Sequence, residues 1–172
     1  FTLNASCPNV AHDDHDNDGP VQDMVNQLKA SLEGADGTPV LVKLGPTDDE
    51  AVFKTMVEAA LRAGAVGIVA TNTVPPDRRA MIGEVDFVWP QHEGEAVGGY
   101  SGPALNAIAA RMIGWAREAG GPDMPIMGVG GVRDGTSAKR LLDAGANLLQ
   151  LYTALTYQGP AVLTNIKQTL VA

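Results

Sequence analysis

The chain holds a single cysteine, Cys7, within the segment FTLNASCPNV at its start. A strand pattern over residues 1–4 runs into a polar turn with three more hydrogen-bonding side chains, Asn4, Ser6 and Asn9. A thiol among amides just after a strand is typical of α/β barrels, whose catalytic groups follow the strand ends. The simpler alternative is a buried cysteine that serves as a small apolar side chain.

Two glycine-rich or hydroxyl-bearing segments follow later strand patterns. GVGGV at 128–132 lacks the side chains that would keep a ligand away from its backbone N–H groups. LYTAL at 151–155 offers the amides of Tyr152 and Thr153 and the Thr153 hydroxyl. A tight turn explains the glycines equally well when they are taken alone. The two segments together, in consecutive units, favour a phosphate-bearing cofactor.

Lys43 interrupts the apolar run PVLVKL at 39–44. Because an isolated buried charge is costly, this ammonium must reach solvent or meet an anion. Side chains alternate along a strand, so Leu41 and Lys43 share a face, and inward placement would direct Lys43 into a pocket. ATNT at 70–73 ends the next strand pattern with an amide and two hydroxyls, which are either site groups or turn residues.

Strand and helix patterns alternate along the chain. The expected strands cover residues 1–4, 39–44, 66–71, 125–129 and 147–151, and the expected helices cover 21–32, 47–62, 104–119, 136–144 and 161–170. Thr47 with Glu50 has the spacing of a capping box, and Ser101 is a candidate cap for the helix after it. The proline-containing segment 74–99 is expected to be a loop without a helix.

This alternation predicts an α/β fold with a parallel sheet and right-handed crossovers, either doubly wound or part of a (β/α)8 barrel. Arg133 occupies the third glycine position of a dinucleotide-binding pattern that would start at Gly128, which argues against the first architecture. Barrels often bind phosphate on the loops after strands seven and eight. We therefore expect residues 1–172 to form about five βα units of a partial TIM barrel, the C-terminal portion of one domain whose N-terminal strands are missing.

Composition excludes several other classes of protein. A net charge of -8 argues against a nucleic-acid partner, and one cysteine forms no internal disulfide. No apolar run reaches the ~18 residues of a membrane span. The three histidines lack zinc-ligand spacing, and the calcium-loop-like stretch 14–19 has Val25 where a glutamate ligand is needed, so no metal is expected.

Six segments closely resemble the C-terminal part of dihydroorotate dehydrogenase, and they occur in family order. These are LNASCPN, VLVKLGP, ATNT, GGYSGPAL, IMGVGGV and LLQLYTALTYQGPAV. The family is a (β/α)8 barrel with FMN at the carboxyl ends of its strands, in agreement with the fold expected above. The resemblance implies FMN-dependent oxidation of dihydroorotate to orotate in pyrimidine biosynthesis.

The same resemblance implies roles for individual residues. Cys7 would be the catalytic base, taking the proton from C5 of dihydroorotate while hydride passes from C6 to N5 of FMN. Substrate would be bound by Asn4, Asn9, Asn72 and Thr73. FMN would be bound by Asn4, Lys43, Thr71, Gly102, Gly130, Gly131, Tyr152 and Thr153, the last four through backbone N–H groups toward its phosphate.

The resemblance leaves the electron acceptor open among quinone, fumarate and NAD. A cysteine base resembles the cytosolic class, whereas LYTALTYQGP resembles the quinone-linked, membrane-associated class. A dihydropyrimidine dehydrogenase-like flavin reductase is the alternative enzyme, and a catalytically inert barrel fragment is the alternative without activity. We expect a cytoplasmic location, or a peripheral membrane one conferred by N-terminal residues absent here. A homodimer is one possible assembly, and the isolated piece is expected to be inactive.

Overall fold

The computed structural model describes residues 1–5, 19–85 and 98–171. Its strands are β1 (Thr2–Asn4), β2 (Leu41–Leu44), β3 (Gly67–Ala70), β4 (Ile126–Val129) and β5 (Leu148–Gln150). Its helices are α1 (Gly19–Gly34), α2 (Glu50–Arg62), the 3-10 helix η1 (Pro76–Ile82), α3 (Leu105–Gly120), α4 (Gly135–Asp143), α5 (Thr153–Gln158) and α6 (Ala161–Val171). No helix within these ranges is both long and apolar enough to cross a lipid bilayer.

All five strands form one parallel sheet in the order β1-β2-β3-β4-β5. A doubly wound sheet reverses its order at a switch point, whereas a barrel adds each strand beside the last. Because the order here never reverses, right-handed crossovers place the helices on one face of the sheet. Consecutive helices accordingly contact one another, α1 with α2, α2 with α3, α3 with α4 and α4 with α6. The expected fold, a partial (β/α)8 barrel, is confirmed.

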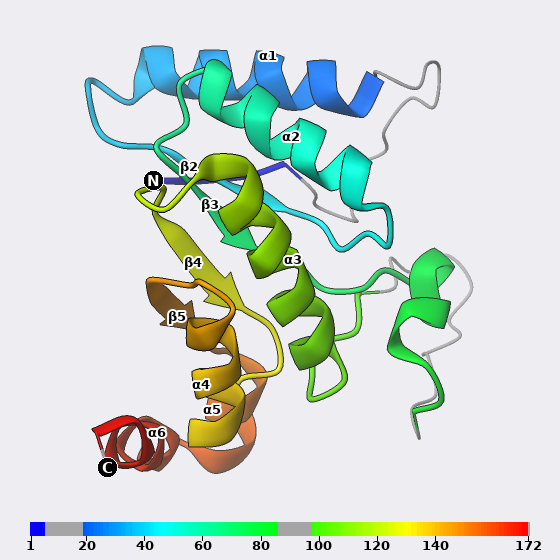
Figure 1. Cartoon of the computed structure of the whole chain (residues 1–172), viewed down its shortest axis with the longest axis vertical. Coiled ribbons are helices and arrows are strands. Elements are labelled where there is room, and N and C mark those ends of the chain that lie inside the picture. The colour runs from blue at the N-terminus through cyan, green and yellow to red at the C-terminus, as the bar shows by residue number, and fades with distance from the viewer. Residues whose placement is uncertain (6–18, 86–97, 172) are drawn as a thin grey trace.

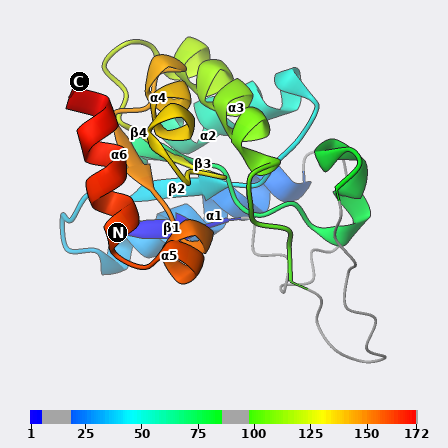
Figure 2. The same ribbon diagram turned by 90° about the horizontal axis from the view of Figure 1, so that it is seen from below.

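The helices follow one another across the molecule in chain order. Figure 1 shows α1 and α2 side by side at one end, α3 in the middle, and α4 with α6 at the other end. In Figure 2, η1 lies apart from the sheet, on the side toward which the strands point. The carboxyl ends of the strands therefore face a region bordered by loops rather than by the helix layer.

Side chains on β2 alternate between two environments. Val42 and Leu44 are fully buried, whereas Leu41 and Lys43 on the opposite face are only partly buried. The buried pair joins Phe53 of α2 in the core between sheet and helices. Burying such a side chain contributes about 1.5–3 kcal/mol. The helix-facing side of the sheet thus supplies stability and leaves the other side for a site.

Close contact between α3 and β4 depends on a glycine in the strand. A Cβ on Gly128 would lie 3.0 Å from both Ile113 Cδ1 and Ala146 Cβ. Those distances are shorter than ordinary van der Waals contact, so a side chain at this position would require Ile113 and Ala146 to shift. The glycines of GVGGV therefore have a packing role in addition to any binding role.

Three local features differ from the sequence-based predictions. The cap of α2 is Asp49, whose side chain accepts from Val52 N at 3.0 Å, while Thr47 accepts from the Asp49 N–H at 3.1 Å. Because the helix begins at Glu50, that glutamate is already helical and closes no capping box with Thr47. Segment 74–99, expected to be free of helix, contains η1, and α5 was not predicted at all.

The Arg117 side chain, near the end of α3, ties together the loops that lead into β4 and β5. Its Nη1 donates to three carbonyl oxygens of the α3–β4 loop, those of Gly121, Pro122 and Met124, at 2.7, 2.9 and 2.8 Å. Its Nη2 donates to the Gly145 carbonyl at 2.7 Å and to Asn147 Oδ1 at 2.9 Å. Asn147 Oδ1 also accepts from Ile126 N at 2.8 Å. One guanidinium therefore fixes the amino ends of two strands.

Replacing Arg117 by lysine should destabilise the protein, because an ammonium cannot reach five acceptors with the geometry of a guanidinium fork. We expect Arg117→Lys to lower the free energy of unfolding by about 2–4 kcal/mol in urea denaturation. Arg62→Lys is the matched control, since exposed Arg62 makes only a 3.3 Å pair with Glu58 and should change stability by less than ~0.5 kcal/mol. Equal losses in the two variants would contradict the role given to Arg117.

Candidate functional site

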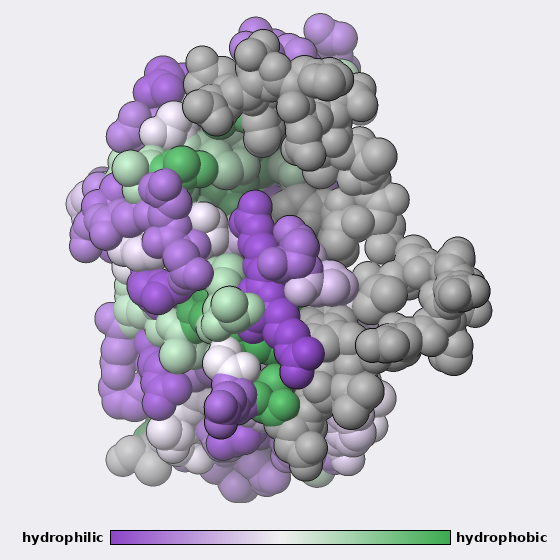
Figure 3. All heavy atoms as spheres, turned by 90° about the vertical axis from the view of Figure 1, so that its right-hand side faces the viewer, coloured by the Kyte–Doolittle hydropathy of each residue, from purple (hydrophilic) through white to green (hydrophobic). Residues whose placement is uncertain are grey.

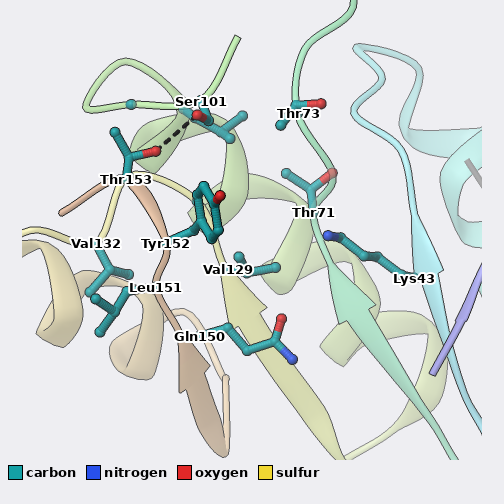
Figure 4. Close-up of a pocket in the computed structure, with 14 residues that line it drawn as sticks. Lys43, Thr71, Thr73, Ser101, Val129, Val132, Gln150, Leu151, Tyr152 and Thr153 are labelled. Carbon is teal, nitrogen blue, oxygen red and sulfur yellow. Dashed lines mark hydrogen bonds between the residues drawn. The ribbon is translucent and has the colours of Figure 1, made fainter. Parts of the chain in front are cut away.

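A cavity of about 540 Å³ lies at the carboxyl ends of β2 to β5. Its lining includes every predicted cofactor residue except Asn4, together with Thr73, a predicted substrate residue (Figure 4). The lining residues that were not predicted are Ser101, Leu105, Val129, Val132, Gln150 and Leu151. The structure thus brings four separate strand ends and the loop before α3 around one hollow.

The surface on this side of the molecule is mixed in polarity. Figure 3 views the face toward which the strands point and shows apolar surface between hydrophilic ridges. Ligand sites combine such an apolar lining with a few polar groups that fix the orientation of the ligand. The residues on the strand ends supply those polar groups here.

Lys43 is the one basic side chain among the described residues that line the cavity. It extends from β2 toward Thr71 in Figure 4, on the side of the cavity away from Thr153. Burial lowers the pKa of its ammonium group, because removing the charge from water disfavours the protonated form. No carboxylate forms an ion pair with it within the described ranges. An anionic ligand in the cavity would offset that cost.

The end of β3 holds its polar side chains by local hydrogen bonds. The buried Thr71 hydroxyl donates to the Leu44 carbonyl at 3.1 Å, and the Ala70–Thr71 peptide bond is cis. Asn72 Oδ1 accepts from Thr73 N at 2.9 Å. These bonds turn the chain at the strand end, so that Thr71 and Thr73 both line the cavity.

Asn4 and Asn72, which are far apart in the sequence, meet beside this site. Asn72 Nδ2 donates to Asn4 Oδ1 at 3.2 Å. Asn4 also pairs with Lys43 in the register of β1 and β2. Neither amide is among the residues that line the 540 Å³ cavity, so their predicted ligand roles stay predictions.

An isolated β-bridge between Val74 and Tyr100 holds the glycine-containing loop before α3 beside the cavity. Val74 and Tyr100 exchange two backbone hydrogen bonds, at 3.0 and 2.7 Å, which carry Gly102 toward Gly131. Gly131 has φ +60°, and a Cβ there would lie 2.7 Å from the Gly102 carbonyl oxygen. Only glycine therefore permits this approach of two loops.

Ser101 is not the cap of α3 that the sequence suggested. The cap position belongs to Ala104, because Leu105 N already bonds to the Gly102 carbonyl at 3.0 Å and the helix begins beyond the reach of the Ser101 hydroxyl. That hydroxyl instead shares a 2.8 Å hydrogen bond with the Thr153 hydroxyl at the start of α5 (Figure 4). The bond joins two loops on the glycine-rich side of the cavity.

Two amides relevant to the site were missed from the sequence. Gln150 lines the cavity from the end of β5 and donates to Met127 Sδ at 2.6 Å. Asn106 is buried beneath the Gly130 loop without lining the cavity. The available signal was a polar residue among apolar ones: Asn106 sits in a helix whose neighbouring turns are apolar, and a buried amide there requires partners.

Cys7 and Asn9, the predicted base and one predicted substrate residue, lie outside the described residues. So does most of the calcium-loop-like stretch, residues 14–18. Across the ranges that are described, no group of three or more His, Cys, Asp or Glu side chains is arranged to hold a metal ion. Among the described residues, the cavity has an ammonium on one side and glycine amides with hydroxyls on the other.

Comparison with known proteins finds one family along the whole chain. A family model described as dihydroorotate dehydrogenase matches residues 1–172. A protein from Marinobacter nauticus named dihydroorotate dehydrogenase (quinone) is 36% identical over 148 residues, which are 85% of this chain and 41% of that protein. A protein of the same name from Haloarcula marismortui is 33% identical over 171 residues, 99% of this chain and 45% of that protein. The chain therefore spans less than half the length of these relatives.

Solved structures agree in fold. The ligand-free dihydroorotate dehydrogenase of Eimeria tenella superposes with a TM-score of 0.73 at 20% identity, covering 98% of this chain and 49% of that one. The complex of the Eimeria tenella enzyme with ferulenol gives a TM-score of 0.69 at 21% identity, covering 98% and 48%. At 20–21% identity, this structural similarity supports the fold, a partial barrel, and does not by itself support a function.

Replacing Lys43 by methionine should show how much the ammonium, which has no ion-pair partner among the described residues, lowers the free energy of unfolding. Because its pKa in the folded chain is lowered from 10.5, the unfolded chain binds more protons between the lowered pKa and 10.5, and wild-type stability rises with pH through that window. Without ligand, Lys43→Met should be at least as stable as wild type at pH 7, with an advantage that shrinks as the pH approaches 10.5. Urea midpoints measured over a pH series test this.

Lys29→Met, on the exposed side of α1, is the control for that comparison. It removes one lysine without removing a half-buried charge, so its urea midpoint relative to wild type should not follow the same pH dependence. A Lys43→Met variant that is less stable than wild type at pH 7 would mean that the ammonium has a favourable partner, and the cost assigned to it would be wrong.

Proposed function

Because the chain belongs to the dihydroorotate dehydrogenase family, we propose that it forms the C-terminal part of a barrel that oxidises dihydroorotate to orotate with FMN. The observation that carries the proposal is the cavity at the strand ends, where Lys43 lies across from Val132 and Thr153 (Figure 4). The chain covers 41% of the Marinobacter nauticus relative and 45% of the Haloarcula marismortui relative, and the remaining strands would close the barrel.

The residues of the cavity fit FMN in charge and in shape. Backbone N–H groups of Gly130, Gly131, Tyr152 and Thr153 would receive the phosphate, as the loops after the last two strands do in many barrels. Lys43 and Thr71 would contact the ring system at the other side. When bound, the flavin would accept the hydride that leaves C6 of dihydroorotate.

Lys43 would serve this cofactor through its charge. A half-buried ammonium without a carboxylate partner in the described chain is stabilised by any negative charge that enters the cavity. Lys43 would be placed to stabilise negative charge on a flavin ring bound in the cavity. The cost that Lys43 imposes on the empty protein would thus favour binding and hydride acceptance.

Cys7 would act as the base that removes the C5 proton of dihydroorotate. It follows β1 directly in the sequence, and β1 ends at Asn4, the partner of Asn72. The Asn4–Asn72 pair, with Asn9 and Thr73, would hold the substrate ring and carboxylate. Because an ordinary thiol has a pKa of about 8.5, the rate of this step should rise with pH unless the site lowers that value.

A quinone is the electron acceptor that the comparisons favour. The sequence left quinone, fumarate and NAD open, whereas the relatives from Marinobacter nauticus and Haloarcula marismortui are both named for quinone. We therefore propose that electrons leave the flavin for a quinone.

Dihydroorotate should reduce the flavin of this protein directly. The protein, expressed from its complete reading frame, should purify with bound FMN, and anaerobic dihydroorotate should bleach the visible flavin absorbance. Dihydrouracil, which lacks the carboxylate, should not do so. A flavin-free protein, or one bleached equally by both compounds, would overturn the assignment, the second result in favour of a dihydropyrimidine dehydrogenase-like reductase.

Replacing Cys7 by serine should slow proton removal while leaving FMN bound. A positioned general base contributes about 10²–10⁴-fold to a rate, so flavin reduction by dihydroorotate at pH 7 should fall by at least ~10²-fold. Stopped-flow reduction measured across pH would show the wild-type rate rising as the thiol ionises and the variant remaining slow. Ser31→Ala, on the exposed side of α1, is the control. An unchanged rate in Cys7→Ser would mean that Cys7 is not the base and only packs as a small apolar side chain.

A further inference from the structure

Asn106, in the first turn of α3, forms hydrogen bonds through both its Nδ2 and its Oδ1, behind the glycine loop of the cavity. It is 3% exposed, and its Nδ2 donates to the Gly130 carbonyl at 3.0 Å and to the Ser137 carbonyl at 3.2 Å. Its Oδ1 accepts from Arg140 Nη1 at 3.0 Å. Both amide hydrogens and the oxygen therefore have partners.

Arg140 determines which way this amide faces. A guanidinium can only donate, so the atom of Asn106 next to it must be the oxygen, and Nδ2 must face the two carbonyls. Ser137 belongs to the capping box with Asp134 that begins α4, where its N–H donates to Asp134 Oδ1 at 2.8 Å. The amide is thus held between α4 and the glycine loop in one orientation.

The bond to Gly130 sets the direction of the next N–H group. The Gly130–Gly131 peptide is trans, so its C=O and N–H point in opposite directions. Asn106 holds the carbonyl on the α3 side of the loop. The Gly131 N–H therefore points away from the Asn106 amide, and Gly130 and Gly131 both line the cavity.

A glycine pair needs such a restraint more than other residues do. Gly130 and Gly131 have φ of +142° and +60°, and glycine exchanges readily between such conformations. Without a bond to the Gly130 carbonyl, the peptide would be free to turn, and its N–H would lose a fixed direction. A preorganised N–H binds an anion more strongly than one that must be ordered on binding.

We propose that Asn106 is a positioning residue, which aims the Gly131 N–H at the phosphate of the cofactor without touching the cofactor itself. The inference rests on the proposed function, because it assumes a flavin with its phosphate at the glycine loop. It adds that affinity for the phosphate depends on a buried amide one layer behind the cavity, held by Arg140 and Ser137.

FMN and riboflavin separate this role from a general structural one, because they differ only by the phosphate. In fluorescence titrations of the apoprotein from the complete reading frame, wild type should bind FMN more tightly than riboflavin. Asn106→Leu, neutral and similar in volume, should weaken FMN binding by about ten- to hundredfold and riboflavin binding by less than about twofold. Asn26→Leu, on the exposed side of α1, is the matched control and should change neither affinity.

Asn106→Ser is the second variant in case leucine prevents folding, which circular dichroism and urea denaturation would reveal. It is neutral and too short to reach both carbonyls, so it should show the same selective loss for FMN. Equal weakening of FMN and riboflavin, or no change in either, would overturn the positioning role and leave the proposed function standing. A wild-type protein that binds neither flavin would reject the proposed function, and the positioning role with it.

Discussion

The parallel register of the sheet is the constraint on which the site depends. Strands that run in one direction all end at the same edge of the sheet. Side chains that are distant in the sequence therefore lie close together at that edge. Lys43 at the end of β2 pairs with Val69 of β3, and Val129 at the end of β4 pairs with Gln150 of β5. Lys43, Val129 and Gln150 then line the same cavity. The glycines and hydroxyl-bearing residues that follow these strands line the cavity for the same reason.

Helix α3 organises both edges of this sheet through two polar side chains. Asn106, in its first turn, holds the Gly130 loop at the carboxyl edge. Arg117, in its last turn, holds the loops that lead into β4 and β5 at the amino edge. Between them the buried side chains of the helix are apolar, and Ile113 among them lies close to Gly128 of β4. A single helix therefore sets the position of β4 at both of its ends.

Much of this arrangement was accessible from the sequence, because local patterns determine it. Alternation along PVLVKL placed Lys43 on the cavity face, and the apolar runs located the strands. Partners distant in sequence were not accessible: Ser101 bonds to Thr153, 52 residues away, rather than capping α3. The six-residue α5 is too short for a periodic pattern to reveal it. Asn106 was overlooked because its partners, two carbonyls and an arginine, become neighbours only when α3, α4 and the glycine loop are packed together.

The Lys43 ammonium lies on the opposite side of the cavity from Val132 and Thr153, and this separation has a consequence for selectivity (Figure 4). A molecule that engages both sides must be long enough to span the hollow and must carry its two polar ends the right way round. A smaller anion would contact one side only and would leave the polar groups of the other side in water. Under the proposed function, contacts at the two ends of the ligand would fix the position of the reacting atoms between them.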